Sequence, residues 1–129
     1  MKLIVCIDDN GGLSFNGRRQ SRDAGLTKWL LEKTRGFCYL PFSAALFQWE
    51  KQALLWENDR LPTDAWLFIE EPSKIPPVDE IHELLLCRWN RSYPADAYLP
   101  FDLNSFRCVE KNEFAGSSHE RITVEHYQK

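Results

Sequence analysis

The sequence predicts an α/β domain of three layers, whose sheet is parallel at first and antiparallel at its C-terminal edge. Between Lys2 and Trp89, short apolar runs alternate with amphipathic segments, which is the order typical of βαβ units. From Ser105 onward, two extended runs are joined by a tight turn, as in a β-hairpin. A length of 129 residues suits one domain, so we expect residues 1–129 to form a single unit.

The first predicted element is a buried strand at the N-terminus. Lys2–Asp8 (KLIVCID) is apolar and rich in branched side chains, without polar alternation, which indicates a strand covered on both faces. The run Asp8–Gly12 (DDNGG) is a strong turn signal. We expect the following segment, Leu13–Arg22, to be an irregular loop with a second turn at Asn16-Gly17.

The first helix is predicted over residues 22–35. Ser21 can cap its N-terminus, Asp23 in its first turn suits the helix dipole, and Gly36 stands where a left-handed C-terminal cap is favoured. Its apolar face has the i, i+3, i+4 spacing of an amphipathic helix and consists of Leu26, Trp29 and Leu30.

The central part of the chain predicts three more strands and a second helix. Phe37–Leu40, Ala65–Ile69 and Leu84–Trp89 are short apolar runs that indicate strands. Ser43 can cap a helix that continues to about Asn58. The apolar face of that helix would be Leu46, Trp49, Ala53 and Trp56. Between the last two strands lies a polar, proline-stiffened connection, in which Val78–His82 can form one helical turn.

The C-terminal part predicts a loop followed by the hairpin. Ser92–Pro100 carries two prolines and is interpreted as a loop. The strands Ser105–Phe114 and His119–Tyr127 are joined by Ala115–Ser118. In the last strand one face should be covered and the other wet, because Ile122, Val124 and His126 alternate with Arg121, Thr123 and Glu125.

Composition excludes several classes of protein. The chain is 43% hydrophobic and 27% charged with a net charge of -3, which excludes a disordered chain and gives no basic field for nucleic acid. No apolar run is long enough to span a bilayer, and Met1-Lys2 leads directly into strand-like sequence. We therefore expect a cytoplasmic protein without a membrane or nucleic-acid partner. An aromatic content of 13%, with five tryptophans, is high for this length.

Cysteines and histidines give no local signature of a metal centre. None of the four cysteines forms a C-x-x-C pair, and the three histidines are scattered. Three of the thiols sit inside apolar runs, where they behave as small buried apolar groups. We expect no bound metal.

Charge is distributed unevenly along the chain. The segment Gly17–Gly36 has six basic and two acidic residues, whereas Glu57–Glu83 has eight acids against two basic residues. Both can be solvated faces. The alternative is that Arg18, Arg19 and Arg22, which cluster in one predicted loop, form an anion site.

Three segments resemble the dihydrofolate reductase family. LIVCIDDNGGLSFNGRRQSRD (3–23) resembles its first strand, mobile loop and the start of its first helix. ELLLCRWNRSYPADAYLPFD (83–102) resembles a late strand and loop, and SFRCVEKNEFAGSSHERITVEHY (105–127) is similar to the C-terminal hairpin. The resemblance covers both ends of the chain in the right order and implies the fold of that family.

The resemblance assigns a role to Asp23. It falls where the family keeps a single active-site carboxylate, which accepts hydrogen bonds from a pterin ring and helps to deliver a proton. A lone acid beside apolar walls can recognise an amidine-like heterocycle through a charge-assisted pair. The alternative is that Asp23 serves only the helix dipole. Together with the arginine cluster, the candidate ligand-binding residues are Phe15, Arg18, Arg19, Arg22, Leu26 and Cys87.

The chain departs from the family where the reductases bind substrate and cofactor. Arg18-Arg19-Gln20 replaces an apolar L-P-W, and Cys87 replaces a threonine. The phosphate-binding G-R-x-T signature is replaced by Leu40–Ser43, in which Ser43 alone can offer a hydroxyl to an anion. The segment 70–83 is too short for the further strand–helix unit with its glycine turn. We expect no cofactor, and NADPH only if the family activity is retained.

Three functions follow as hypotheses. The first is a shortened reductase-like protein that does not reduce folate and binds a small heterocyclic or anionic ligand near Asp23 and the Arg18–Arg22 loop. The second is a non-enzymatic protein that self-associates as a homo-oligomer, which would cover sheet surface left by the missing unit. The third is an NADPH-dependent reductase with a site completed across a dimer.

Overall fold

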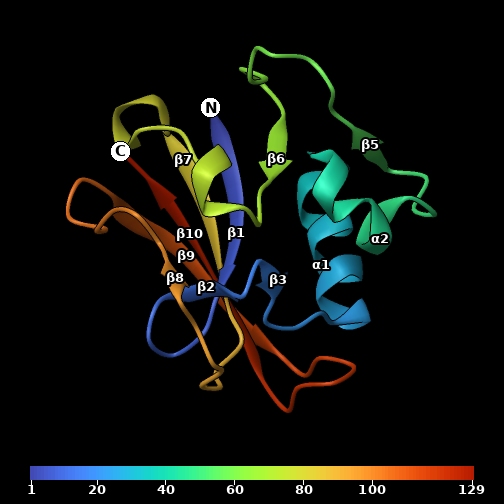
Figure 1. Ribbon diagram of the computed structural model, residues 1–129, viewed down its shortest axis with the longest axis vertical. Helices are drawn as coiled ribbons and strands as arrows, with labels where there is room; N and C mark the ends of the chain where they lie inside the picture. Colours follow the sequence, from blue (N-terminus) through green and yellow to red (C-terminus); the bar gives the residue numbers. More distant parts are fainter.

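The computed structural model describes residues 1–129, and a seven-stranded sheet runs through its centre (Figure 1). The strand order is β5-β4-β6-β1-β7-β10-β9. The strands are β1 (Lys2–Ile7), β4 (Phe37–Tyr39), β5 (Ala53–Leu55), β6 (Trp66–Phe68), β7 (Glu83–Arg88), β9 (Arg107–Phe114) and β10 (Ile122–Gln128). In this order, the strands β5, β4, β6, β1 and β7 are all parallel to their neighbours in that group. Strand β10 is antiparallel to both β7 and β9. The predicted fold class, a parallel sheet ending in an antiparallel hairpin, is confirmed.

The central strands are buried on both sides of the sheet, as their apolar sequences predict. Leu3, Ile4 and Val5 of β1 have no exposed surface, although consecutive residues point to opposite faces. Helix α1 (Ala24–Thr34) packs on one face, where Leu26 and Leu30 join the core cluster. The opposite face is covered by connections between strands rather than by helices, with Leu13, Ile81, Leu99, Phe101 and Phe106 packed there.

Helix α1 lies within two residues of its predicted span, but its N-terminal cap is different from the expected one. Asp23, not Ser21, is the N-cap, and its carboxylate accepts the Leu26 N–H. At the other end Arg35 has a left-handed conformation, and the N–H of Gly36 bonds to the Leu31 carbonyl. Asp23 therefore stands just before the helix instead of inside its first turn.

The predicted second helix over Ser43–Asn58 is wrong. A 3-10 turn, η1 (Pro41–Ser43), leads into the single turn α2 (Ala44–Phe47), and the chain then enters the edge strand β5. The apolar spacing misled because Ala53 is buried by pairing with Phe37 of β4, whereas Trp49 is 87% exposed. Pairing with the sheet overrides a weak helical periodicity here.

The two segments predicted as loops form a small second sheet. Its strands are β2 (Gly12–Phe15), β3 (Arg18–Arg19) and β8 (Ala97–Tyr98), in the order β3-β2-β8. Asn16 and Gly17 have φ angles of 51° and 70°, and they join β2 to β3 as a two-residue hairpin turn. The expectation of an irregular loop over Leu13–Arg22 was therefore wrong, although its predicted turn at Asn16-Gly17 is confirmed. Ser92–Pro100 is a loop as predicted, except for the two residues of β8.

The connection between β6 and β7 contains neither a strand nor an α-helix. It has two 3-10 turns, η2 (Pro72–Lys74) and η3 (Val78–Glu80), so the helical turn predicted at Val78–His82 is confirmed in 3-10 form. In the C-terminal hairpin, Thr123 is buried rather than wet, because the amide of Asn90 lies over it and donates to its hydroxyl. None of the helices is both long and apolar enough to cross a membrane.

Candidate functional site

A pocket opens at the carboxyl ends of β1, β6 and β7, beside the N-terminal half of α1. This is the edge at which open α/β sheets bind ligands. Its apolar lining residues are Cys6, Leu13, Leu26, Leu30, Leu46, Phe47, Phe68, Ile69 and Trp89. Its polar lining residues are Arg19, Gln20, Ser21, Arg22, Asp23, Thr27 and Glu70. The pocket therefore has apolar walls and a polar rim, as small-molecule sites do.

The pocket is narrow. Its cavity volume is about 30 Å³. That is room for about two waters. A flat ring can enter only if the side chains of the rim move apart. A second, more open hollow of about 390 Å³ also borders Asp23, between α1, α2 and Ser117-Ser118.

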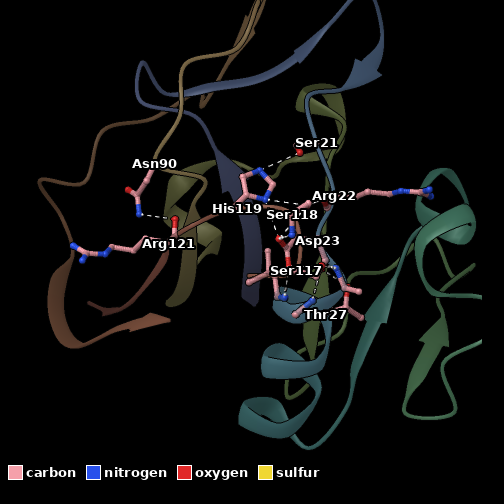
Figure 2. A network of polar contacts seen from close by, with 12 residues as sticks. Ser21, Arg22, Asp23, Thr27, Asn90, Ser117, Ser118, His119 and Arg121 are labelled. Atoms are coloured by element: carbon pink, nitrogen blue, oxygen red, sulfur yellow. Dashed lines mark hydrogen bonds and ion pairs between the residues drawn. The ribbon is translucent and has the colours of Figure 1, made fainter. Parts of the chain in front are cut away.

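The carboxylate of Asp23 is the most heavily hydrogen-bonded group of the site. Its Oδ1 accepts the Leu26 N–H at 3.1 Å and the backbone N–H and hydroxyl of Ser117 at 2.8 and 3.1 Å. Its Oδ2 accepts the backbone N–H and hydroxyl of Ser118 at 2.8 and 3.2 Å, and the Nδ1–H of His119 at 2.9 Å. Figure 2 shows these groups closing around the carboxylate. All of its lone-pair directions are occupied by the protein.

These bonds keep Asp23 ionised. Burial alone would raise the pKa of Asp23, but the hydrogen bonds from Ser117, His119, Ser118 and Leu26 outweigh burial and hold that pKa well below its usual range. A carboxylate in this state is a poor proton donor at neutral pH. It joins the start of α1 to the hairpin turn between β9 and β10.

His119 connects this carboxylate to two hydroxyl groups. Its side chain is 1% exposed and stacks on Trp89 with ring centroids 4.7 Å apart. Its Nε2 lies 2.9 Å from the Tyr93 hydroxyl and 3.2 Å from the Ser21 hydroxyl. The sequence analysis placed neither His119 nor Tyr93 in the site, and it assigned Ser21 only a helix cap, because the contacts join residues up to 98 positions apart. The run Ser-Ser-His in the hairpin turn was the only signal.

Arg19 is paired inside the rim of the pocket. Its Nε and a terminal nitrogen donate to the two carboxylate oxygens of Glu70 at 2.7 and 3.0 Å. The Ser43 hydroxyl donates to the same Glu70 at 2.7 Å. Arg19 and Ser43, which were predicted to contact an anionic ligand, thus both bind the carboxylate of Glu70.

The remaining predicted site residues are divided between the pocket and its surroundings. Arg22 and Leu26 line the pocket, and the Arg22 side chain extends away from Asp23 (Figure 2). Phe15 and Arg18 are exposed on the small sheet and do not line the pocket. Cys87 is wholly buried and does not line the pocket; it pairs with Cys6 across the adjacent strands β7 and β1, and the contact between these two thiols, with burial, raises the pKa of Cys6.

A buried amide oxygen of the pocket lining has no partner. The Nε2 of Gln20 donates to Asp8 at 3.3 Å and to the Pro94 carbonyl at 3.4 Å. Because both of these partners are acceptors, the orientation of the amide is fixed, and Oε1 is left without a donor. An unsatisfied buried acceptor is costly unless a ligand or water completes it.

The structure is similar to a dihydrofolate reductase from Enterococcus faecalis, solved in complex with NADP(H) and RAB-propyl. The TM-score is 0.63 at 13% sequence identity, and the alignment covers 98% of this chain and 94% of that chain. At this identity the similarity establishes the fold. No family model and no curated protein sequence matches the chain. No three metal-ligating side chains lie together anywhere in the structure.

Proposed function

We propose that this dihydrofolate-reductase-like protein binds a small heterocyclic molecule, neutral or anionic, in the pocket at the carboxyl ends of β1, β6 and β7, and that it does not reduce folate. The observation that carries the proposal is the unpartnered oxygen of Gln20 in the lining of an apolar pocket. A ring N–H would satisfy that oxygen. Arg22 at the rim would attract an anionic substituent.

The state of Asp23 argues against folate chemistry in this pocket. In the family that this chain resembles, the acid binds the pterin and helps to protonate it. Here six donor groups of Leu26, Ser117, Ser118 and His119 lie within hydrogen-bond distance of the Asp23 carboxylate. A pterin amidine would have to displace these donors, and each hydrogen bond to a charged group contributes about 1.5–3 kcal/mol.

The strand ends do not fit a dinucleotide diphosphate. After β4 the chain reads Pro41-Phe42-Ser43, and after β6 it reads Glu70-Glu71, so neither turn has the glycines that let a backbone approach phosphate closely. The Ser43 hydroxyl, which could meet an anion, donates to Glu70 instead. A carboxylate at this position repels a diphosphate, which supports a function without NADPH.

The direct test is a thermal-shift screen with a pterin, dihydrofolate, NADPH, a nucleoside monophosphate and inorganic phosphate as separate probes. A saturable rise in melting temperature with one heterocycle supports the proposal. Gln20→Ala should weaken the affinity for that heterocycle about tenfold, which corresponds to the loss of one hydrogen bond. Gln48→Ala, at an exposed glutamine just after α2, is the matched control. Oxidation of NADPH by dihydrofolate would refute the non-reductase assignment.

A second function is favoured by the exposed apolar residues at the β5 edge. Trp49, Leu54 and Leu55 are all exposed, and β5 has a neighbour on one side only. An unprotected edge strand can pair with a second copy. We infer that the protein forms a homodimer in which two β5 strands pair antiparallel about a twofold axis. Self-association and ligand binding use different surfaces and are compatible.

A further inference from the structure

Ser21, His119 and Asp23 lie in a line of hydrogen bonds beside the pocket (Figure 2). The Ser21 hydroxyl is 3.2 Å from Nε2 of His119, and Nδ1 of the same ring is 2.9 Å from Oδ2 of Asp23. Ser21 and Asp23 both line the pocket. The three residues come from the segment before α1 and from the turn between β9 and β10, so only the fold brings them together.

The chemistry of the partners fixes the tautomer of His119. Asp23 is an acceptor, so the proton of the neutral ring sits on Nδ1. The lone pair of Nε2 then faces the Ser21 hydroxyl, which can donate to it. Trp89 stacks on the ring and keeps it in this orientation. This is the order of hydroxyl, imidazole and carboxylate that activates a serine nucleophile.

Tyr93 shares the lone pair of Nε2 in the resting structure. Its hydroxyl is 2.9 Å from Nε2 and 3.4 Å from the Ser21 oxygen. When Ser21 donates to Nε2, the Tyr93 hydroxyl can donate to the serine oxygen instead. The backbone N–H groups of Ser21 and Arg22 make no hydrogen bond within the chain, so both are free to donate to a ligand.

We propose that Ser21 and His119, with Asp23 as the positioning carboxylate, hydrolyse small carboxylic esters whose acyl group enters the apolar part of the pocket. The proposal rests on the proposed function in one respect, that the pocket admits a small molecule. The narrow space favours a short acyl chain. Leu13, Leu26 and Trp89 would contact it.

The reaction balances with water as the only co-reactant. The Ser21 oxygen forms a bond to the ester carbonyl carbon while its proton moves to Nε2 of His119. The bond to the leaving alcohol breaks as His119 returns that proton to the departing oxygen, which leaves an acyl ester on Ser21. Water then attacks the acyl carbon, gives a proton to His119, and releases the carboxylic acid with the Ser21 hydroxyl restored.

A fluorophosphonate probe tests the nucleophile directly, with p-nitrophenyl acetate as the reporter ester. We expect one phosphonyl group per chain, located on Ser21 by peptide mass spectrometry, and turnover of the ester. Ser21→Ala should lose both, whereas Ser92→Ala, an exposed serine with no side-chain hydrogen bond, should keep both. Labelling of another serine, or none, would overturn the proposal.

Two further measurements separate catalysis from a structural role. Asp23→Asn, studied at a temperature where circular dichroism shows it folded, should slow labelling by roughly a hundredfold or more; an unchanged rate would refute the role of Asp23. Thermal shift with the probe heterocycle on Ser21→Ala reports binding without chemistry. If the protein binds a heterocycle but Ser21 is never labelled, the triad is refuted and the proposed function stands. If Ser21 is labelled but no heterocycle binds, only the proposed function is refuted.

Discussion

The carboxylate of Asp23 accepts a hydrogen bond from His119 at 2.9 Å and so links the cap of α1 to the turn of the C-terminal hairpin. Both side chains are almost completely buried. The same carboxylate caps α1 through the Leu26 N–H. One side chain thus holds a helix, a hairpin turn and the rim of the pocket in place.

Asp23→Asn should destabilise the fold by about 2–4 kcal/mol at neutral pH, because it removes a charged acceptor from several buried donors and weakens a helix cap. Chemical denaturation monitored by circular dichroism measures the difference. Asp79→Asn, at an exposed acid in η3, is the control and should change stability by less than about 0.5 kcal/mol. A loss equal to that of the control would show that the network contributes nothing.

Stability should depend on pH through the same group. The folded-state pKa of Asp23 is depressed, so its contribution is fully present above the unfolded value of about 4 and is lost as pH falls below it. The wild-type melting temperature should therefore drop between about pH 5 and pH 2 more steeply than that of Asp23→Asn. Parallel curves for the two proteins would contradict the assignment.

Gly116→Ala should disrupt the contact between the hairpin turn and Asp23. An added Cβ would lie 2.4 Å from Oδ2 of Asp23 and 2.7 Å from Cδ1 of Ile122, so the carboxylate would have to shift. We expect a loss of about 2–3 kcal/mol, within the range for steric overpacking. Gly17→Ala meets no atom and is strained only by its φ of 70°, so it should cost about 1 kcal/mol. Equal costs would contradict this.

Glu70→Gln should loosen the rim of the pocket. It weakens the bidentate pair with Arg19 and the bond from Ser43, in a site where the Glu70 side chain is mostly buried. We expect a loss of about 1–3 kcal/mol in denaturant midpoint experiments. The matched control is Glu71→Gln, because the neighbouring Glu71 forms no ion pair. If both variants melt together, the Arg19–Glu70 pair does not hold the rim.

The β5 edge gives a prediction for solution behaviour. Trp49→Ser with Leu54→Lys should shift the protein from dimer to monomer in sedimentation equilibrium, because it removes apolar contact area and places a charge on the edge strand. Phe15→Ser, an exposed aromatic on the small sheet, should leave the dimer intact. A wild-type protein that is monomeric at all concentrations would refute the homodimer.

The sheet was predictable from the sequence because its strands carry their own signal. The β1 run is continuously apolar, and the hairpin strands are separated by an evident turn. The Ser43–Asn58 segment was not predictable in this way, since Ala53 fits either a helical stripe or an edge strand and only pairing with β4 decides. Asn16-Gly17 was recognised as a turn, but the pairing of the strands β2 and β3 on either side of it was not predicted.

The site was predictable only in part. Asp23, Arg19, Arg22 and Leu26 were named from the sequence and line the pocket. His119 and Ser21 were missed because no local pattern joins two residues 98 positions apart. The ion pair between Arg19 and Glu70 could not be predicted from the sequence either, since an isolated arginine and an isolated acid are most often solvated.

Trp89 emission measures most directly whether the pocket binds a small heterocycle through Gln20. Trp89 lines the pocket, and the difference between wild type and Trp89→Phe isolates its signal from the other tryptophans. We predict saturable quenching of that signal by a heterocyclic probe, with an affinity about tenfold weaker in Gln20→Ala. Quenching that never saturates, or the same affinity in Gln20→Ala, would contradict binding of the heterocycle through Gln20.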